Sequence, residues 1–574
     1  MYTLGINAAF HDPSACLVQD GMVVAAAEEE RFTRIKHGKR PIPFSAYELP
    51  FHAIDYCLSA AGIVLTDVDH VAYSFDPYIK LGHQKRAAVT LPLEPSAGPP
   101  DQEWETPWDP LFLAHIVNAP RHLAGGVPHH LQVRFRSASS DGPYRWHFIP
   151  HHLAHAASAF HPSPFTRAAV MTLDGRGEKA TTTYWLGQDH RLTPLGAVEM
   201  PHSLGLLYEG LTRHLGFLHS SDEYKVMALA SFGKPAYLDA VRDLVRYEGE
   251  GRYRIASIDW EGRFGPPRPA GSPFEQRHYD LARSVQTVLE DTVIQLAQWL
   301  RDTTRTTDLC LAGGVALNCV MNGRLRDKGL FRHIWVQPAA GDAGTSLGAA
   351  LWIDGRMRDF PTERRYVMDH VFLGPHYDDA EISEFLRRAK IRHRPMIDVA
   401  HETADILARD RIVGWFQGRM EFGPRALGAR SILASPLSPG MQERMNDLKD
   451  REDFRPVAPV VLEERASDWF TDHGPSPFML FVSDVLPHQA HRIPAVRHVD
   501  GTARVQTIRR EQHPRYYDVL QAFGRRTGVP VLVNTSFNTR SEPIVCTPRD
   551  AVEAFFTSPL DALVIGSFLL EKDR

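Results

Sequence analysis

Short apolar runs, separated by polar turns, occur twice in the same arrangement along the first third of the chain. The first copy consists of three strand-like runs, YTLGIN (2–7), SACLVQDG (14–21) and MVVAAAEEE (22–30). The second copy consists of AAVMTLDG (168–175), ATTTYWLG (180–187) and LTPLGAVEM (192–200). The Asp20-Gly21 pair predicts a tight hairpin. Because helical stretches follow both copies, the pattern predicts a duplicated α/β domain with its ligand cleft at glycine-rich strand ends.

Two later segments, 309–323 and 334–352, each predict a strand, a glycine turn and a helix. The polar connection MRDFPTERRYVMDH then predicts the end of this first domain near residue 362. A new α/β pattern runs from RIVGWFQG to ALVIGSFLL. We therefore expect two domains, residues 1–362 and 363–574.

Residues 76–146 interrupt the first domain. The run LPLEPSAGPPDQEWETPWDP is rich in proline and carries Trp104 and Trp108. Two interpretations are open: a solvated surface insertion, or a lid that recognises an acceptor molecule, since long irregular loops in compact domains are often functional. In either case we expect an irregular insert.

Composition narrows the class of protein. The chain has 574 residues, and its net charge of −5 argues against a general nucleic-acid binder, which usually carries a basic excess. The five cysteines are scattered and form no CxxC pair, so they indicate a reducing cytoplasm and neither a disulfide framework nor a thiolate zinc site. The first residues, MYTLGINAAF, lack a charged lead and a long apolar core, so we expect no signal peptide, and we expect no membrane span because no apolar run approaches the required length of about 20 residues.

Three histidines open the stretch HHLAHAASAF (151–160). His151 and His155 are four apart and share one face of the predicted helix, where they are either metal ligands or hydrogen-bonded core residues. A divalent metal also favours carboxylates. Asp174 ends the predicted strand VMTLD, and Asp342 lies in the turn AAGDAG. Two histidines and two aspartates suit iron(II), manganese or zinc.

Glycine turns follow several predicted strands. LAGGVALN places Gly313 and Gly314 after an apolar run, with Asn318 one turn into a helix, and GDAGTSLG repeats this design. LGINAAFHDPSA is a third turn, with His11. Such turns are often only tight strand–helix corners, but three of them in a duplicated domain favour a nucleotide, because glycine lets the backbone approach a phosphate.

A basic block lies in the second half of the chain. Its cations and neighbouring amides and hydroxyls are Arg419, Arg425, Arg430, Lys449, Arg451, Arg455, Arg504, Asn534, Thr535, Ser536 and Asn538. Arginine forks match phosphate and carboxylate oxygens, so this block predicts a site for a small anionic substrate. The alternative is a set of ion pairs with acids such as Glu421 and Glu452.

Ten motifs occur in an order that resembles the nodulation-type O-carbamoyltransferases, which include antibiotic-biosynthesis enzymes such as the tobramycin O-carbamoyltransferase. They are FHDPSACLVQDG, AAAEEERFTRIKHG, HHLAHAASAF, LDGRGE, YKVMALASFG, AGGVALN, GDAGTSLGAA, GRMEFGPRALGARSIL, KDREDFRPVAP and VLVNTSFNTRSEPIV. The resemblance spans nearly the whole chain and is weakest in residues 76–146.

The resemblance implies an α/β fold with a duplicated first domain of the actin, Hsp70 and sugar-kinase type and a second domain like threonylcarbamoyl-adenylate synthases. It also implies an ATP-dependent reaction. Carbamoyl phosphate loses its phosphate in the second domain, the carbamate reacts with ATP to give carbamoyl adenylate, and the first domain passes the carbamoyl group to an alcohol.

The resemblance further implies a role for individual residues. The expected metal ligands, usually for iron(II), are His151, His155, Asp174 and Asp342. The expected catalytic residues are His11, as base for the acceptor hydroxyl, and Lys36, near the carbamoyl group. The expected nucleotide contacts are Gly313, Gly314 and Asn318, with a looser match at Glu223 and Lys225. The expected carbamoyl phosphate contacts are Arg425, Lys449, Arg455, Arg504, Asn534 and Ser536.

The expected partners are carbamoyl phosphate, ATP with Mg²⁺ and a hydroxylated small molecule, with no nucleic acid or membrane and with homodimers conceivable. Three alternatives stay open: an actin-fold kinase or ATPase, a tRNA threonylcarbamoyl transferase, and a non-catalytic metal or nucleotide sensor. The kinase leaves the basic block unused, and the acidic net charge argues against the tRNA enzyme.

Overall fold

The computed structural model describes residues 1–38, 49–81, 109–125, 144–360, 366–471, 474–539 and 542–572. These residues form two compact units. The first comprises Met1–Gly205, Leu300–Ala316 and Phe331–Met368, and the second comprises Leu206–Trp299, Leu317–Leu330 and Asp369–Arg574. The boundary that the sequence predicts at residue 362 lies outside the described residues and stays a prediction.

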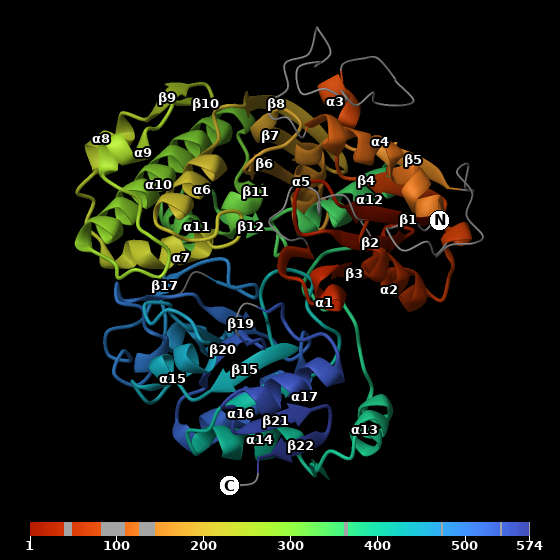
Figure 1. The fold of residues 1–574 in the computed structure, drawn as a ribbon, viewed down its shortest axis with the longest axis vertical. Helices are drawn as coiled ribbons and strands as arrows, with labels where there is room; N and C mark the ends of the chain where they lie inside the picture. The colour runs from red at the N-terminus through yellow and green to blue at the C-terminus, as the bar shows by residue number, and fades with distance from the viewer. Residues whose placement is uncertain are drawn as a thin grey trace. The chain divides into compact units, whose positions relative to one another are not determined.

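The first unit contains two five-stranded sheets with the same strand order (Figure 1). The first sheet is β3–β2–β1–β4–β5, built from Met22–Glu28, Ser14–Gln19, Tyr2–Asn7, His70–Tyr73 and Arg145–Phe148. The second is β8–β7–β6–β11–β12, built from Arg191–Glu199, Ala180–Gln188, Arg167–Leu173, Asp308–Ala312 and His333–Val336. In both, the first three strands are antiparallel and the last two run parallel to the third. The predicted duplication is confirmed.

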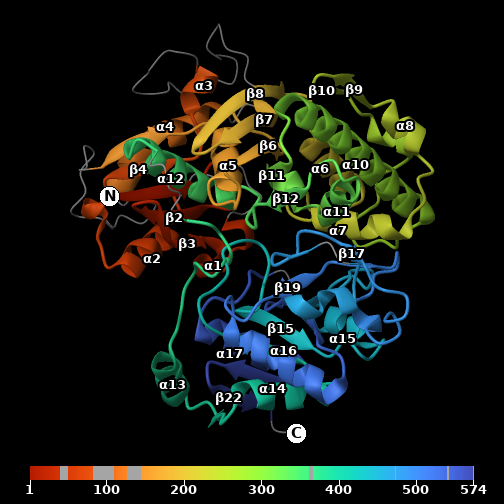
Figure 2. The same ribbon diagram turned by 180° about the vertical axis from the view of Figure 1, so that it is seen from behind.

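Two buried helices lie between these sheets, as both ribbon views show (Figures 1 and 2). Helix α12 (Ala343–Met357) packs on β1, β2 and β4, while α5 (His151–Phe160) packs on β6, β7 and β11, and the two helices contact each other. A Cβ atom at Gly348 would collide with the carbonyl oxygen of Ala154, and one at Gly5 with that of Ser346. Glycine therefore permits the close approach that brings the starts of α5 and α12 together.

The predicted hairpin between β2 and β3 is confirmed, because Asp20 and Gly21 both have positive φ, 50° and 86°. The prediction of an irregular insert over 76–146 is wrong for part of its length. Residues Pro77–Leu81 form α3, and Asp109–Gly125 form α4. Leu113, Ile116 and Leu123 of α4 are buried at helical spacing in the core beside the first sheet. The proline-rich run with Trp104 and Trp108 lies outside the described residues.

The remaining elements of the first unit are short. They are α1 (Glu30–Thr33), the 3₁₀ turn η1 (Lys36–Gly38), α2 (Phe51–Ala61), the turn η3 (Leu65–Asp67) and η5 (Gly314–Leu317), whose last residue falls in the second unit.

The second unit has an eight-stranded mixed sheet in the order β13–β22–β21–β14–β15–β20–β16–β19. The strands are Arg394–Pro395, Phe568–Glu571, Ala562–Ile565, Val413–Phe416, Arg430–Ala434, Val531–Ser536, Ala458–Leu462 and Gln506–Ile508. The helices that follow residue 369 are α13 (Asp379–Arg388), α14 (Val399–Ala408), α15 (Met441–Leu448), α16 (Pro514–Thr527) and α17 (Pro548–Thr557). The short pieces are β17 (Ser483–Asp484), β18 (Thr502–Ala503), η6 (Glu463–Asp468) and η7 (Pro494–Val496).

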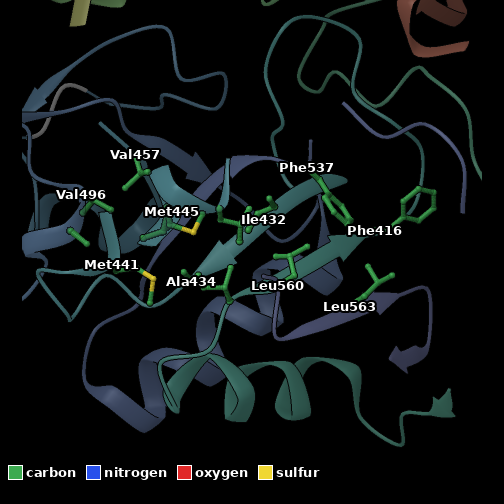
Figure 3. Packing of buried hydrophobic residues seen from close by; sticks show 14 of the residues in the cluster. Phe416, Ile432, Ala434, Met441, Met445, Val457, Val496, Phe537, Leu560 and Leu563 are labelled. Atoms are coloured by element: carbon green, nitrogen blue, oxygen red, sulfur yellow. The ribbon is translucent and has the colours of Figure 1, made fainter. Parts of the chain in front are cut away.

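Both faces of this sheet are buried. Phe416, Ile432 and Leu563 pack with Met441 and Met445 on one face (Figure 3). Their strand neighbours Trp415, Leu433 and Val564 pack on the other face, under α14 and α16. Side chains on a strand alternate between faces, which is why these strands read as continuous apolar runs in the sequence.

The second unit also includes earlier segments of the chain. These are α6 (Leu204–His214), α7 (Glu223–Leu229), η4 (Ala230–Phe232), α8 (Leu238–Arg242), β9 (Val245–Gly249), β10 (Arg252–Ile255), α9 (Trp260–Phe264), α10 (Gln276–Thr304) and α11 (Cys319–Asp327). The first two residues of α6 and the last five of α10 fall in the first unit. In the part of the chain that is described, no helix is both long and apolar enough to cross a bilayer. All five cysteines are buried, and none of them forms a disulfide in the described structure.

Candidate active site

Four buried side chains meet in the first unit. His151 and His155 project from the first turns of α5, Asp174 follows β6, and Asp342 precedes α12. The two Nε2 atoms are 3.1 Å apart. His151 Nε2 lies 3.4 Å from Asp174 Oδ2 and 3.5 Å from Asp342 Oδ1. His155 Nε2 lies 3.7 Å from each of these oxygens. The structure thus brings together all four residues that the sequence offers as metal ligands.

The donor set fits a divalent cation. Ligands about 2.1 Å from a tetrahedral ion are about 3.4 Å from one another, close to the separations seen here. Among the described residues, neither carboxylate oxygen of Asp342 has a hydrogen-bond partner although both are buried. A buried charge of this kind needs a compensating partner. Burial alone lowers the pKa of His151, but Asp342 and Asp174 outweigh it and hold this pKa well above its usual value.

Neighbouring groups orient the ligands. The Gly314 amide donates to Asp174 Oδ1 at 2.7 Å, which leaves Oδ2 to face the histidines. His151 Nδ1 lies 3.2 Å from the carbonyl oxygen of Ser74, which can only accept, so Nδ1 is the donor of this contact and Nε2 is the nitrogen that would face a metal. Sequence reasoning missed Glu178, whose Oε1 accepts the His151 amide at 2.8 Å. Its signal was a glutamate in the glycine loop of LDGRGE, next to the aspartate ligand.

The third histidine of the cluster is a core residue. His152 Nδ1 is 2.7 Å from Thr172 Oγ1, and Nε2 is 2.9 Å from the carbonyl oxygen of Ala180. Burial, followed by His151 and His155, lowers the pKa of His152 to about 3. For His151 and His155, the role of metal ligand stays a prediction.

The predicted base lies beside this centre. His11 Nδ1 is 3.0 Å from Asp12 Oδ2 and 3.8 Å from Asp342 Oδ2, and its side chain is 38% exposed, so a substrate can reach it. Burial lowers the pKa of His11, but Asp342 and Asp12 raise it to about 10. A cation held by Asp342 opposes this rise. Lys36 is the first residue of η1. The next residue, His37, has its Nδ1 2.9 Å from Asp12 Oδ1.

The glycine turn has a structural duty. Gly313 has φ 91°, and a Cβ there would collide with the carbonyl oxygen of Leu173. Gly314 uses its amide on Asp174. Asn318, in the second unit, caps α11 by accepting from the Met321 amide at 3.0 Å and donates to Gln286 Oε1 at 2.9 Å. Their role in binding a nucleotide stays a prediction.

The two loosely matched nucleotide contacts also have partners within the protein. Lys225 Nζ is 2.9 Å from Glu452 Oε1 and 3.2 Å from Asp222 Oδ2. Glu223 Oε1 accepts the Ser220 amide at 2.7 Å. Both residues begin α7, and a nucleotide role for either is a prediction.

The basic block contains arginines whose donors are unused. Arg425 Nη2 donates to the carbonyl oxygen of Leu317 at 2.9 Å, but in the described chain Nε and Nη1 are buried without a hydrogen-bond partner. Burial, and then the charge of Arg504, lowers the pKa of Arg425 to about 9. Arg451 Nη2 is likewise buried and unpartnered within the described ranges. Burial, then Arg455 and Arg504, lowers the pKa of Arg451 to about 9.

The other predicted contacts lie around the end of β20. Lys449 Nζ donates to Ser536 Oγ at 3.1 Å and to Asn538 Oδ1 at 2.6 Å. Asn534 Nδ2 donates to Gln506 Oε1 at 2.7 Å, and Asn534 Oδ1 is buried with no hydrogen-bond partner in the described residues. Arg455 Nη1 lies 3.6 Å from Glu452 Oε2. Arg455 therefore has an acid nearby, as the ion-pair alternative expects, and its role in binding carbamoyl phosphate stays a prediction. Arg425 and Arg451 are members of the block whose buried donors have no acceptor among the described residues.

Two other members of the block are structural. Arg430 is fully buried over the Phe416 ring, 3.6 Å from its centroid, and donates to the carbonyl oxygens of Gln417, Gly418 and Pro375. Arg419 donates to the carbonyl oxygen of Leu373 at 2.7 Å. Glu421 pairs with no arginine in the described chain; it accepts the amides of Leu427 and Ala429, both at 2.7 Å, and so shapes the loop that carries Arg425.

A cavity of about 650 Å³ adjoins the block in the second unit. Its walls include Glu452, His498 and an aromatic cluster of Phe232, Phe274, Tyr279 and Phe454. This volume is typical of sites for molecules of nucleotide size.

The first unit thus holds a buried group of two histidines and two aspartates, and the described part of the second unit holds arginines with buried donors that have no hydrogen-bond partner. Comparison with known families identifies the class. The model for the carbamoyltransferase N-terminus matches residues 2–88 and 142–351, and the model for the carbamoyltransferase C-terminus matches residues 404–572. The chain belongs to the carbamoyltransferase family, as the ten motifs predict, and is a transferase.

Relatives cover most of the chain. Nodulation protein NolNO of Sinorhizobium fredii is 39% identical over 99% of this chain and 80% of its own length. Nodulation protein NolO of Bradyrhizobium diazoefficiens is 42% identical over 74% of this chain and 78% of its own. An uncharacterised protein of Synechocystis is 40% identical over 100% of this chain and 97% of its own.

Similar solved structures are remote. Full-length HypF in its phosphate- and nucleotide-bound form has a TM-score of 0.35 at 13% identity, over 62% of this chain and 55% of that one. The ROK hexokinase of Thermus thermophilus has a TM-score of 0.28 at 15% identity, over 61% and 98%. Scores this low add nothing about function.

Proposed function

We propose that this protein is an ATP-dependent O-carbamoyltransferase that moves the carbamoyl group of carbamoyl phosphate, through carbamoyl adenylate, to a hydroxyl of a natural product or antibiotic. The observation that carries the proposal is Arg425, in a chain that belongs to the carbamoyltransferase family. A guanidinium with two buried, unused donors beside a second arginine suits a small dianion better than solvent.

In the first half-reaction, water cleaves carbamoyl phosphate to carbamate and phosphate. The phosphate is bound, and its growing negative charge is stabilised, by Arg425, Arg504, Arg455, Lys449, Asn534 and Ser536. The carbamate oxygen then attacks the α-phosphorus of ATP and pyrophosphate leaves, which gives carbamoyl adenylate. Gly313, Gly314, Asn318, Glu223 and Lys225 are the proposed nucleotide contacts, and Mg²⁺ accompanies ATP.

In the second half-reaction, the acceptor hydroxyl attacks the carbamoyl carbon and AMP leaves. His11 takes the hydroxyl proton, and Lys36 steadies the carbamoyl group. His151, His155, Asp174 and Asp342 would hold the divalent metal, which we propose is iron(II) and which supplies a Lewis acid for carbonyl or phosphoryl oxygens. We further propose a cytoplasmic location and leave a homodimer as a working expectation.

The two half-reactions can be tested apart. Purified protein given carbamoyl phosphate and ATP should form AMP derivatives and pyrophosphate, and given synthetic carbamoyl adenylate it should carbamoylate an added alcohol. An actin-fold kinase would instead release ADP and would not consume carbamoyl phosphate. Screening candidate alcohols, including aminoglycosides, nucleoside antibiotics and nodulation sugars, would identify the acceptor.

A further inference from the structure

A chain of three buried polar side chains runs beneath the candidate active site in the first unit. Asn7 is the last residue of β1, Ser74 follows β4, and Thr345 lies in the first turn of α12. All three are 0% exposed. Buried polar groups are almost always hydrogen-bonded, and a network of such bonds makes the surrounding core rigid.

Asn7 holds the loop that carries the proposed base. Its Nδ2 donates to the carbonyl oxygens of His11 and Asp12, both at 2.9 Å. Its Oδ1 accepts from Ser74 Oγ at 3.2 Å. Two carbonyl oxygens can only accept, so the orientation of the amide is fixed, and aspartate in this place would have no proton to donate.

Ser74 joins this loop to the metal centre. Its carbonyl oxygen lies 3.2 Å from His151 Nδ1, the contact that leaves His151 Nε2 free to coordinate. Its hydroxyl lies 2.8 Å from Thr345 Oγ1, which is in turn 2.6 Å from the carbonyl oxygen of Asp342. The single Thr345 proton is shared between these two acceptors. The chain thus touches the base loop at one end and two ligand residues at the other.

We propose that Asn7, Ser74 and Thr345 are positioning residues that fix the His11 loop relative to the metal ligands His151 and Asp342. The proposal rests on the proposed function only for the role of His11; the effect on the ligands stands without it. Groups behind metal ligands set ring orientation and ligand basicity, and their loss typically weakens metal binding about 10- to 100-fold. Misplacement of the base by about 1 Å has a similar effect on turnover.

The test compares variants of the full-length protein that differ by one hydroxyl or amide. Thr345→Val and Ser74→Ala each remove a hydroxyl from the chain of hydrogen bonds, whereas Thr345→Ser keeps it. Ser163→Ala is the matched control, because Ser163 is equally buried and donates to the carbonyl oxygen of Phe160 at 2.7 Å, away from the four ligands. Metal-stripped protein is titrated with Co²⁺, whose visible absorption reports affinity and ligand geometry, and thermal melts report the fold.

We expect Co²⁺ to bind Thr345→Val and Ser74→Ala about tenfold or more weakly, with an altered spectrum, and Thr345→Ser and Ser163→Ala to bind like wild type. Asn7→Asp should keep the Co²⁺ spectrum but lower kcat for transfer from supplied carbamoyl adenylate, with little change in KM. If Thr345→Val and Ser74→Ala match Ser163→Ala in affinity and spectrum, the proposal is wrong. A wild-type protein that transfers no carbamoyl group contradicts the proposed function instead, and the Co²⁺ titrations still decide the positioning role.

Discussion

Arg425 lies in the segment before β15 and Arg430 is the first residue of that strand, and the structure predicts opposite effects of the same substitution at the two positions. Arg430 is fully buried, and its Nη1 and Nη2 groups donate to the backbone carbonyl oxygens of Gln417, Gly418 and Pro375. Arg425 has two buried donors that no group among the described residues accepts. Methionine is similar in length and carries no charge, so Arg425→Met and Arg430→Met form a matched pair.

The magnitudes follow from the bonds. In Arg425→Met, each unsatisfied buried donor that is removed relieves about 1–3 kcal/mol, while the lost bond to Leu317 gives up about 1 kcal/mol. The ligand-free variant should therefore unfold at the same temperature as wild type or a higher one. Arg430→Met leaves several carbonyl oxygens buried without donors and should lose about 3 kcal/mol or more. Thermal and urea unfolding of both variants measure this difference.

Activity should show the reverse of stability. A lost charge-assisted contact to phosphate costs about 1.5–3 kcal/mol, so Arg425→Met should make carbamoyl adenylate about ten- to a hundredfold more slowly. Supplied with synthetic carbamoyl adenylate and an acceptor, it should transfer at the wild-type rate. Chromatography of the adenylate and the product follows both steps. If Arg425→Met fails equally with supplied adenylate while still consuming carbamoyl phosphate, the arginine belongs to acceptor binding and the assignment is refuted.

Four further predictions follow from the same structure. His155→Ala removes one of four metal ligands and should release the metal while α5 stays folded; elemental analysis and circular dichroism decide, and full occupancy at wild-type affinity would make His155 a core residue. His11→Ala should still form carbamoyl adenylate but transfer it slowly, since its role is at the acceptor hydroxyl; equal loss of both steps, measured by chromatography, would refute that role. Deleting residues 90–110, most of which lie outside the described residues, should spare adenylate formation and change only which alcohols are accepted; a folded variant without the first half-reaction would contradict this. Burial lowers the pKa of His513 to about 4, and its ring caps α16 by accepting the Tyr516 amide, so its contribution to stability is lost as the pH falls from about 6.5 toward 4; His513→Asn keeps an acceptor without titrating and should lose less stability than wild type in urea melts between pH 7 and pH 5.

The sequence predicts the parts of this fold that depend on local pattern. The Asp20-Gly21 hairpin and the repeated strand triplets are confirmed, because turn chemistry and strand periodicity are short-range signals. Helix α4 was missed because prolines in the neighbouring run outweighed the apolar spacing of Leu113, Ile116 and Leu123.

The candidate site also has a part that the sequence predicts and a part that only the structure shows. The four expected ligands carry chemistry that a sequence displays, and the structure brings them together. His152 has the same residue type and the same helix as the ligands, yet only its neighbours Thr172 and Ala180 reveal that it is a core residue. The unused donors of Arg425 and the bonds of Ser74 are likewise properties of three-dimensional packing, which no spacing along the chain encodes.

The formation of carbamoyl adenylate is the central claim and can be measured without knowing the acceptor. Full-length protein is incubated with ¹³C-labelled carbamoyl phosphate, ATP and hydroxylamine, which traps the adenylate as hydroxyurea. The proposed reaction predicts labelled hydroxyurea that depends on ATP and on protein, with one AMP and one pyrophosphate for each molecule trapped. Release of ADP without AMP, or labelled hydroxyurea at the same rate without ATP, would contradict it.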